Sequence, residues 1–269
     1  TEDDATPYVI ADALMYADGK AIVQMGNMSL RLTGLSKQRI DSIWAANNSS
    51  VSLTAVKQAP VLFDYASINA FAIGNPSDAF GDKYKIFDKD RIIARLPGPP
   101  FQFLDRIVSI KDCEQWQLKA GAIIEGQYDV PEDAWYFSAD RQNVMPFSVL
   151  LEIALQPCGW LAAYLGSALT SDVDMSFRNL GGKATQLLAV GPDTGTLTIK
   201  IKITNVALSG GMIIQNYDFE VRSAEGIVYV GDTYFGFFSK AALADQVGIR
   251  EVEPYAPNSE EKDRALQFA

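Results

Sequence analysis

The sequence predicts an α+β fold in which an antiparallel sheet wraps around one long central helix, preceded by a hairpin and a helical extension. Residues 147–169 are almost continuously apolar, which is typical of a helix buried on all sides. Strand-like runs precede this stretch at 101–110 and 116–128, and four runs rich in β-branched and aromatic residues follow it, at 173–179, 195–208, 212–222 and 227–238. Because a helix that is apolar all round needs cover on several sides, we expect one sheet to curve around it.

The patterning divides the chain into four parts. Residues 1–47 predict two strands, 8–16 and 21–32, joined by an Asp-Gly turn, then a short helix at 36–47. This part is an N-terminal extension or, alternatively, the end of a preceding domain of the same fold. Residues 48–95 predict a polar linker with one helix, which Asp64 caps and Gly74 ends.

The third part, residues 96–239, holds the sheet and the central helix, and residues 240–269 are predicted to form a C-terminal linker. Two glycine pairs in the third part, Gly181-Gly182 and Gly210-Gly211, are predicted to be turns between strands.

Composition narrows the functional classes. The net charge of −10 argues against nucleic acid or an anionic membrane surface as a partner, because both repel an acidic protein. The two cysteines, Cys113 and Cys158, have no metal-like spacing, so we expect no metal site, no disulfide framework and a cytoplasmic setting. Glu152, Gln156 and Pro157 interrupt the apolar stretch, which favours a buried helix over a membrane span.

Glu152 is the strongest candidate for a catalytic residue. A carboxylate in the middle of an apolar helix costs free energy unless it is paired or functional. Apolar surroundings favour the protonated form, which a general acid needs. Gln156 follows one turn later on the same face, so both side chains can reach the same substrate oxygen. The alternative is that Glu152 pairs with Arg141 or Arg178 and only positions the helix.

Several motifs in combination resemble one family. Four motifs are similar to those of bacterial 3-hydroxyacyl-acyl-carrier-protein dehydratases of the 3-hydroxydecanoyl type. They are Leu-Pro-Gly-Pro-Pro at 96–100, Leu-Asp-Arg at 104–106, Trp-Tyr-Phe at 135–137, and Met145-Pro146 followed by Glu152 and Gln156. With 70–74 and 231–238, the pattern resembles the dehydratase region of bacterial polyunsaturated fatty acid synthases over residues 60–250. The resemblance implies the hotdog fold, which is a sheet wrapped around a central helix.

The resemblance also implies a composite active site. In such a site a His from one hotdog removes the α-proton of a 3-hydroxyacyl thioester, and a carboxylic acid from the central helix of its partner protonates the leaving hydroxyl. Glu152 stands at the acid's position and Gln156 at that of its associated amide. Trp135, Tyr136 and Met145 are expected to contact substrate, and the alternative for the two aromatic residues is packing against the core helix.

The chain departs from the family at the base, because none of its 269 residues is a His. The family's His position falls near Asp140, and a carboxylate in an exposed loop is too weak a base to remove an α-proton well. Phe147 replaces the Gly whose helix-start amide polarises the thioester carbonyl in the family, so we expect Phe147 to border the substrate and to block that approach.

These observations lead to three hypotheses for the function of the chain. The leading hypothesis is a dehydratase-type hotdog module that donates Glu152 to a site shared with an adjacent hotdog or a second copy, and is incomplete alone. Its substrate arrives on the phosphopantetheine of an acyl carrier protein, and no other cofactor is expected. The alternatives are a non-catalytic structural or carrier-docking domain and a hotdog thioesterase. Because carrier proteins are acidic, docking needs a basic patch, for which Lys200, Lys202, Lys183 and Arg178 are the candidates.

Overall fold

The computed structural model describes residues 8–17, 20–31, 60–139, 143–244 and 259. These fall into two units, one with the N-terminal residues and the other spanning Ser50–Ala244. In the first unit, β1 (Tyr8–Ala17) and β2 (Lys20–Arg31) pair antiparallel as the Asp-Gly signal predicts. The helix expected at 36–47 lies outside the described residues.

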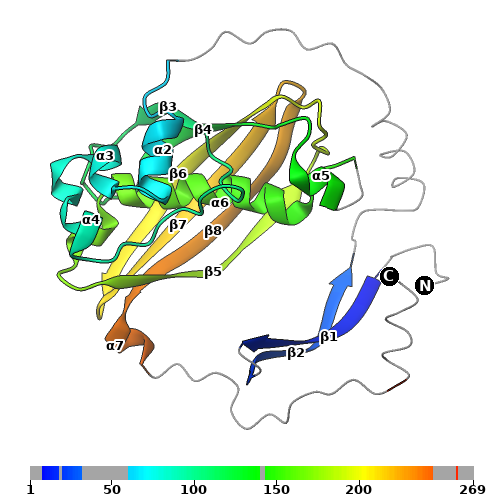
Figure 1. The fold of residues 1–269 in the computed structure, drawn as a ribbon, viewed down its shortest axis with the longest axis horizontal. Coiled ribbons are helices and arrows are strands. Elements are labelled where there is room, and N and C mark those ends of the chain that lie inside the picture. Colours follow the sequence, from blue (N-terminus) through cyan, green and yellow to red (C-terminus); the bar gives the residue numbers. More distant parts are fainter. Residues whose placement is uncertain (1–7, 18–19, 32–59, 140–142, 245–258, 260–269) are drawn as a thin grey trace. The chain divides into compact units, whose positions relative to one another are not determined.

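The second unit contains one six-stranded sheet with a long helix against it (Figure 1). The strands are β3 (Arg106–Lys111), β4 (Ile123–Asp129), β5 (Met175–Gln186), β6 (Thr196–Ser209), β7 (Met212–Ser223) and β8 (Gly226–Ser239). Their order across the sheet is β3-β4-β6-β7-β8-β5, and every neighbouring pair is antiparallel. The central helix is α6 (Phe147–Tyr164). The predicted α+β architecture is therefore confirmed.

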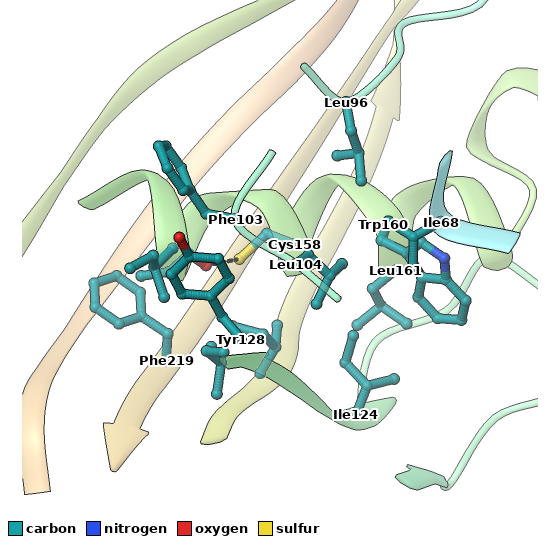
Figure 2. Packing of buried hydrophobic residues seen from close by; sticks show 14 of the residues in the cluster. Ile68, Leu96, Phe103, Leu104, Ile124, Tyr128, Cys158, Trp160, Leu161 and Phe219 are labelled. Carbon is teal, nitrogen blue, oxygen red and sulfur yellow. Dashed lines mark hydrogen bonds between the residues drawn. The ribbon is translucent and has the colours of Figure 1, made fainter. Parts of the chain in front are cut away.

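The core lies between one face of the sheet and α6. Alternate residues of β6 and β7, such as Ile199, Ile201 and Phe219, are buried against the helix, as a strand with one covered face requires. Figure 2 shows Phe103, Tyr128 and Phe219 near one end of this helix and Ile68, Trp160 and Ile124 near the other.

Helix α6 has the length and composition of a membrane span, but most of it is buried inside the unit, as the sequence predicts for a core helix. Pro157 lies within α6 without ending it. At the end of the sheet, α7 (Lys240–Leu243) begins with the Ser239 side chain capping the N–H of Ala242.

The segment before the sheet differs from the expected linker with one helix. It contains α2 (Tyr65–Ala72), α3 (Pro76–Phe80), a 3-10 turn η1 (Asp82–Tyr84) and α4 (Ile86–Lys89). Asp64 caps α2 by accepting a hydrogen bond from Ser67 N at 2.9 Å, as predicted. Buried aromatic residues from this segment join the core around one end of α6, whereas α5 (Trp135–Ala139) lies toward the other (Figure 1). Residues 60–95 are thus part of the domain.

One predicted turn is instead part of a strand. Gly210-Gly211 does form the β6–β7 turn, but Gly181-Gly182 lies inside β5 next to a bulge in its pairing with β8. A Cβ on Gly182 would come within 2.3 Å of the Asp232 carbonyl oxygen, so Gly182 permits a close approach between the two strands. The absence of a turn makes β5 a 12-residue strand at the edge of the sheet.

Candidate active site

One face of α6 borders a cavity of about 330 Å³. Glu152, Leu155, Gln156 and Gly159 line it, and their spacing of three, four and seven residues places them on the same side of the helix. The two predicted catalytic residues therefore share one cavity.

The remaining walls are mostly apolar and come from four parts of the chain. They are formed by Phe177 and Asn179 of β5, Phe235 and Phe237 of β8, Phe71 of α2, and residues Ala94, Arg95, Leu96 and Pro97. An apolar cavity with a few convergent polar groups is the usual form of a small-molecule site.

Glu152 is half-buried at this cavity. None of the ion pairs among the described residues involves its carboxylate. Arg178, one of the two suggested partners, donates instead to the backbone oxygen of Phe177 at 2.7 Å, and Arg141, the other, lies outside the described residues. The polar contact of Glu152 in the described structure is with Gln156, whose Nε2 lies 3.4 Å from Glu152 Oε2.

Gln156 is held mainly by the backbone. Its side chain is buried, its Oε1 accepts a hydrogen bond from Phe103 N at 2.7 Å, and its Nε2 donates to Phe101 O at 2.8 Å. The amide thus fastens the segment before β3 to the central helix. Because its side-chain oxygen and nitrogen both already form hydrogen bonds, Gln156 orients Glu152 and has little hydrogen-bonding capacity left for a substrate oxygen.

The other expected contact residues lie away from this cavity. Trp135 is partly exposed and donates from Nε1 to Pro100 O at 3.1 Å, while the hydroxyl of buried Tyr136 lies 3.3 Å from that of Tyr128. Met145 is buried, and its N–H donates to Val190 O at 2.7 Å. None of these three described residues lines the cavity of Glu152, and Asp140 lies outside the described residues.

Phe147 borders a second cavity, of about 230 Å³, beside the N-terminal half of α6. Its ring packs edge-on against Tyr229 with the ring centroids 5.6 Å apart. Burial raises the pKa of Tyr229 to about 12, so its hydroxyl remains protonated at neutral pH. Leu155 and Asn179 line both cavities, so the two lie next to each other along the side of α6 that faces β5 and β8.

Both cavities border the edge strand β5. This strand pairs with β8 on one side only, and most of its side chains are exposed, including Phe177 and Leu180 at 41% each. An open edge with exposed apolar side chains is a surface on which another chain can add.

The four basic residues proposed for carrier docking do not form a continuous basic surface. In the strand register, Lys200 lies between Glu125 and Glu220. Lys202 lies opposite Asp218, and Lys183 opposite Asp232. Opposite charges in register attract each other and reduce the local potential, so this face gives no specific support for carrier binding.

The sequence did not single out Phe71, Arg95, Gly159 or Asn179 as site residues. Gly159 could have been found, because it lies seven residues after Glu152 on the same helical face. The others carry no local signal, since strand pairing and the packing of α2 bring them to the cavity.

Comparisons with known proteins identify the family of this chain. The sequence profile of the FabA-like domain matches residues 96–231. One subunit of the polyunsaturated fatty acid synthase of Thraustochytrium sp. is 32% identical over 199 residues, which are 69% of this chain and 13% of that protein. The chain therefore spans only a small part of its relative's length.

Two solved structures are similar at low sequence identity. The dehydratase heterocomplex ApeI:P from Xenorhabdus doucetiae gives a TM-score of 0.38 at 14% identity, covering 63% of this chain and 91% of that one. A thioesterase from Streptococcus pneumoniae, solved with coenzyme A, gives a TM-score of 0.34 at 15% identity, covering 49% of this chain and 85% of that one. With the profile matching half of the sequence and including Glu152 and Gln156, the chain belongs to the FabA-like family.

Proposed function

We propose that this chain is the acid-donating half of a 3-hydroxyacyl-acyl-carrier-protein dehydratase and that a His-bearing hotdog supplies the base. The observation that carries the proposal is Glu152, which lines the cavity beside an open sheet edge and is oriented by Gln156. The family membership and the relationship to part of a polyunsaturated fatty acid synthase support the same reaction class.

The reaction needs two groups. A base removes the proton α to the thioester carbonyl, the electron pair forms the carbon–carbon double bond, and the C3–oxygen bond breaks as Glu152 transfers its proton to the leaving hydroxyl. The products are an enoyl thioester and water. Glu152 ends as a carboxylate and the base ends protonated, so a proton must return to Glu152 before the next turnover.

The composition of the chain restricts its partner. Two copies of a chain without His bring two acids and no imidazole, so a homodimer lacks the base that the family's reaction uses. We therefore favour a different hotdog, adjacent in a longer protein or bound as a separate chain, over a second copy. The exposed edge of β5 beside both cavities is the surface we assign to it.

The substrate is proposed to arrive on the phosphopantetheine arm of an acyl carrier protein, in the cytoplasm. The free thiols of Cys113 and Cys158 are consistent with that setting. The cavity of Glu152 is not lined by Trp135, Tyr136 or Met145. We propose that these three residues contact substrate only where the partner completes the site.

Two other functions retain some support. Phe147 at the start of α6 and the missing His fit a structural domain without catalysis. The carboxylate of Glu152, without an ion-pair partner among the described residues, also fits a thioesterase in which it activates water.

One experiment separates the three functions. Dehydration of a 3-hydroxyacyl pantetheine thioester is measured with this chain joined to the His-bearing hotdog, for the wild type, Glu152→Gln and the exposed control Glu132→Gln. We expect Glu152→Gln to lower kcat by about 10²–10⁴-fold, as for loss of a general acid, and the control to match the wild type. Unchanged dehydration in Glu152→Gln would indicate a structural role, and thiol release by this chain alone would indicate a thioesterase.

A further inference from the structure

The far end of the Glu152 cavity is built by residues that precede the FabA-like match. That match begins at residue 96, whereas Phe71 of α2, Ala94 and Arg95 lie before it and line the cavity. The helical segment before the sheet is thus part of the site as well as of the core.

Arg95 holds this segment together, and Tyr84 bonds it to the central helix. Arg95 Nη1 donates to Gly74 O at 2.6 Å and to Phe71 O at 3.3 Å, which holds the C-terminal end of α2 at the cavity. The hydroxyl of buried Tyr84 donates to the backbone oxygen of Ala163 near the end of α6. Phe71 itself is buried and packs edge-on against Phe80, with the ring centroids 5.0 Å apart.

Gly159 lets Leu96 of this wall approach α6 closely. It lies two turns after Glu152 on the cavity face, and a Cβ at this position would meet Leu96 Cδ2 at 3.2 Å. That contact is tighter than ordinary van der Waals distance, so any side chain at residue 159 must enter the space beside Leu96 or displace it.

The chemistry of this end suits an alkyl chain. Phe71, Leu96, Phe235 and Phe237 provide apolar surface, and Nη1 of the nearby Arg95 donates to backbone oxygens. A pantetheine arm carries amides that need hydrogen-bond partners when buried, whereas methylene groups need none. The acyl tail, rather than the arm, is the portion of the substrate that this end can bury favourably.

We propose that Gly159, together with Phe71 and Leu96, sets the longest acyl chain that the site accepts, so that the segment before the family match acts as a specificity element. This inference rests on the proposed dehydratase function. A side chain at residue 159 takes the place of methylene groups of the tail, and each buried methylene is worth about 4-fold in kcat/KM.

The test uses the chain with its His-bearing hotdog and 3-hydroxyacyl pantetheine thioesters of short (about four carbons) and long (about ten carbons) acyl length. Gly159→Ala, which suits a helix, should lower kcat/KM for the long substrate by about 4-fold, and Gly159→Leu, with four side-chain carbons, by about 250-fold. Both variants should keep kcat/KM for the short substrate within about 2-fold of the wild type. The control Ala66→Leu, which adds comparable bulk on the exposed side of α2, should behave as the wild type toward both substrates.

The outcomes separate the two claims. Equal losses for short and long substrates in the Gly159 variants, while Glu152→Gln still abolishes dehydration, would overturn the specificity role alone. Undiminished dehydration of both substrates by Glu152→Gln would overturn the proposed function and this inference with it. Selective loss of the long substrate in Gly159→Ala, a variant expected to fold, would support the role even if Gly159→Leu were unstable.

Discussion

The side-chain nitrogen of Gln156 lies 3.4 Å from a carboxylate oxygen of Glu152, one helical turn before it. The same amide bonds two backbone groups of the segment that precedes β3, at Phe101 and Phe103. The orientation of the proposed acid and the attachment of this segment to α6 therefore depend on one side chain.

Replacing Gln156 should destabilise the domain. Gln156→Leu leaves the buried N–H of Phe103 and the carbonyl of Phe101 without their partner, and we expect a loss of about 2–3 kcal/mol in the free energy of unfolding. Urea unfolding at neutral pH measures it, with the exposed Gln117→Leu as a control expected to stay within about 0.5 kcal/mol. A Gln156→Leu protein as stable as the wild type would show that these bonds do not hold the segment.

Tyr84 should contribute to the attachment of the helical segment to α6. Tyr84→Phe removes a buried hydrogen bond to Ala163 O while keeping the ring, so we expect a loss of about 1–2 kcal/mol. Thermal unfolding compared with Tyr65→Phe, an exposed tyrosine in the same segment, isolates the effect of the buried bond. Equal melting temperatures for the two variants would contradict the assignment.

Stability should fall in alkali because of buried tyrosines. Burial raises the pKa of Tyr84 and Tyr217 above the ordinary value of 10.0, and that of Tyr229 to about 12. Above pH 10 the unfolded chain releases these protons while the folded chain retains them, so the free energy of unfolding decreases as pH rises. The slope is about 1.4 kcal/mol per pH unit for each such tyrosine.

Urea unfolding between about pH 8 and about pH 11 checks this prediction. Tyrosinate absorbance in native conditions should show that these residues ionise only as the protein unfolds. A free energy of unfolding that stays constant across this range would contradict it.

The edge strand offers a test of partner binding. Leu180→Asp places a charge on an exposed position of β5, so the stability of this chain should change by less than about 0.5 kcal/mol. Its affinity for the His-bearing hotdog should fall at least about tenfold, because a buried unpaired charge at an interface is costly. Titration calorimetry measures the affinity, and Leu208→Asp, exposed at the end of β6, is the matched control. Equal binding by both variants would exclude β5 as the interface.

Much of the fold followed from local patterns. The runs predicted for β6, β7 and β8 agree with the structure within a few residues, because alternating buried positions leave a strong period of two. The four short elements at 65–89 were not all foreseen: α3 has five residues and α4 four, too few for a helical period to show. The prediction of a turn at Gly181-Gly182 failed because glycine there serves close strand packing.

The site was predicted in part. Glu152 and Gln156 could be identified because polar residues are conspicuous within an apolar helix, and the structure brings both to one cavity. The backbone partners of Gln156, the aromatic wall of Phe177 and Phe237, and the contribution of Phe71 depend on long-range packing, which one sequence does not reveal. The role of Trp135 and Tyr136 toward substrate stays a prediction.

The central claim is that this chain provides the acid and a partner provides the base. Its most direct test is dehydration of a 3-hydroxyacyl pantetheine thioester during titration of this chain with a His-bearing hotdog whose own carboxylic acid has been removed. We predict no dehydration by either protein alone and activity that rises to a plateau at equal stoichiometry, but not with Glu152→Gln. Dehydration by this chain without the partner, or equal activity with Glu152→Gln, would contradict the account.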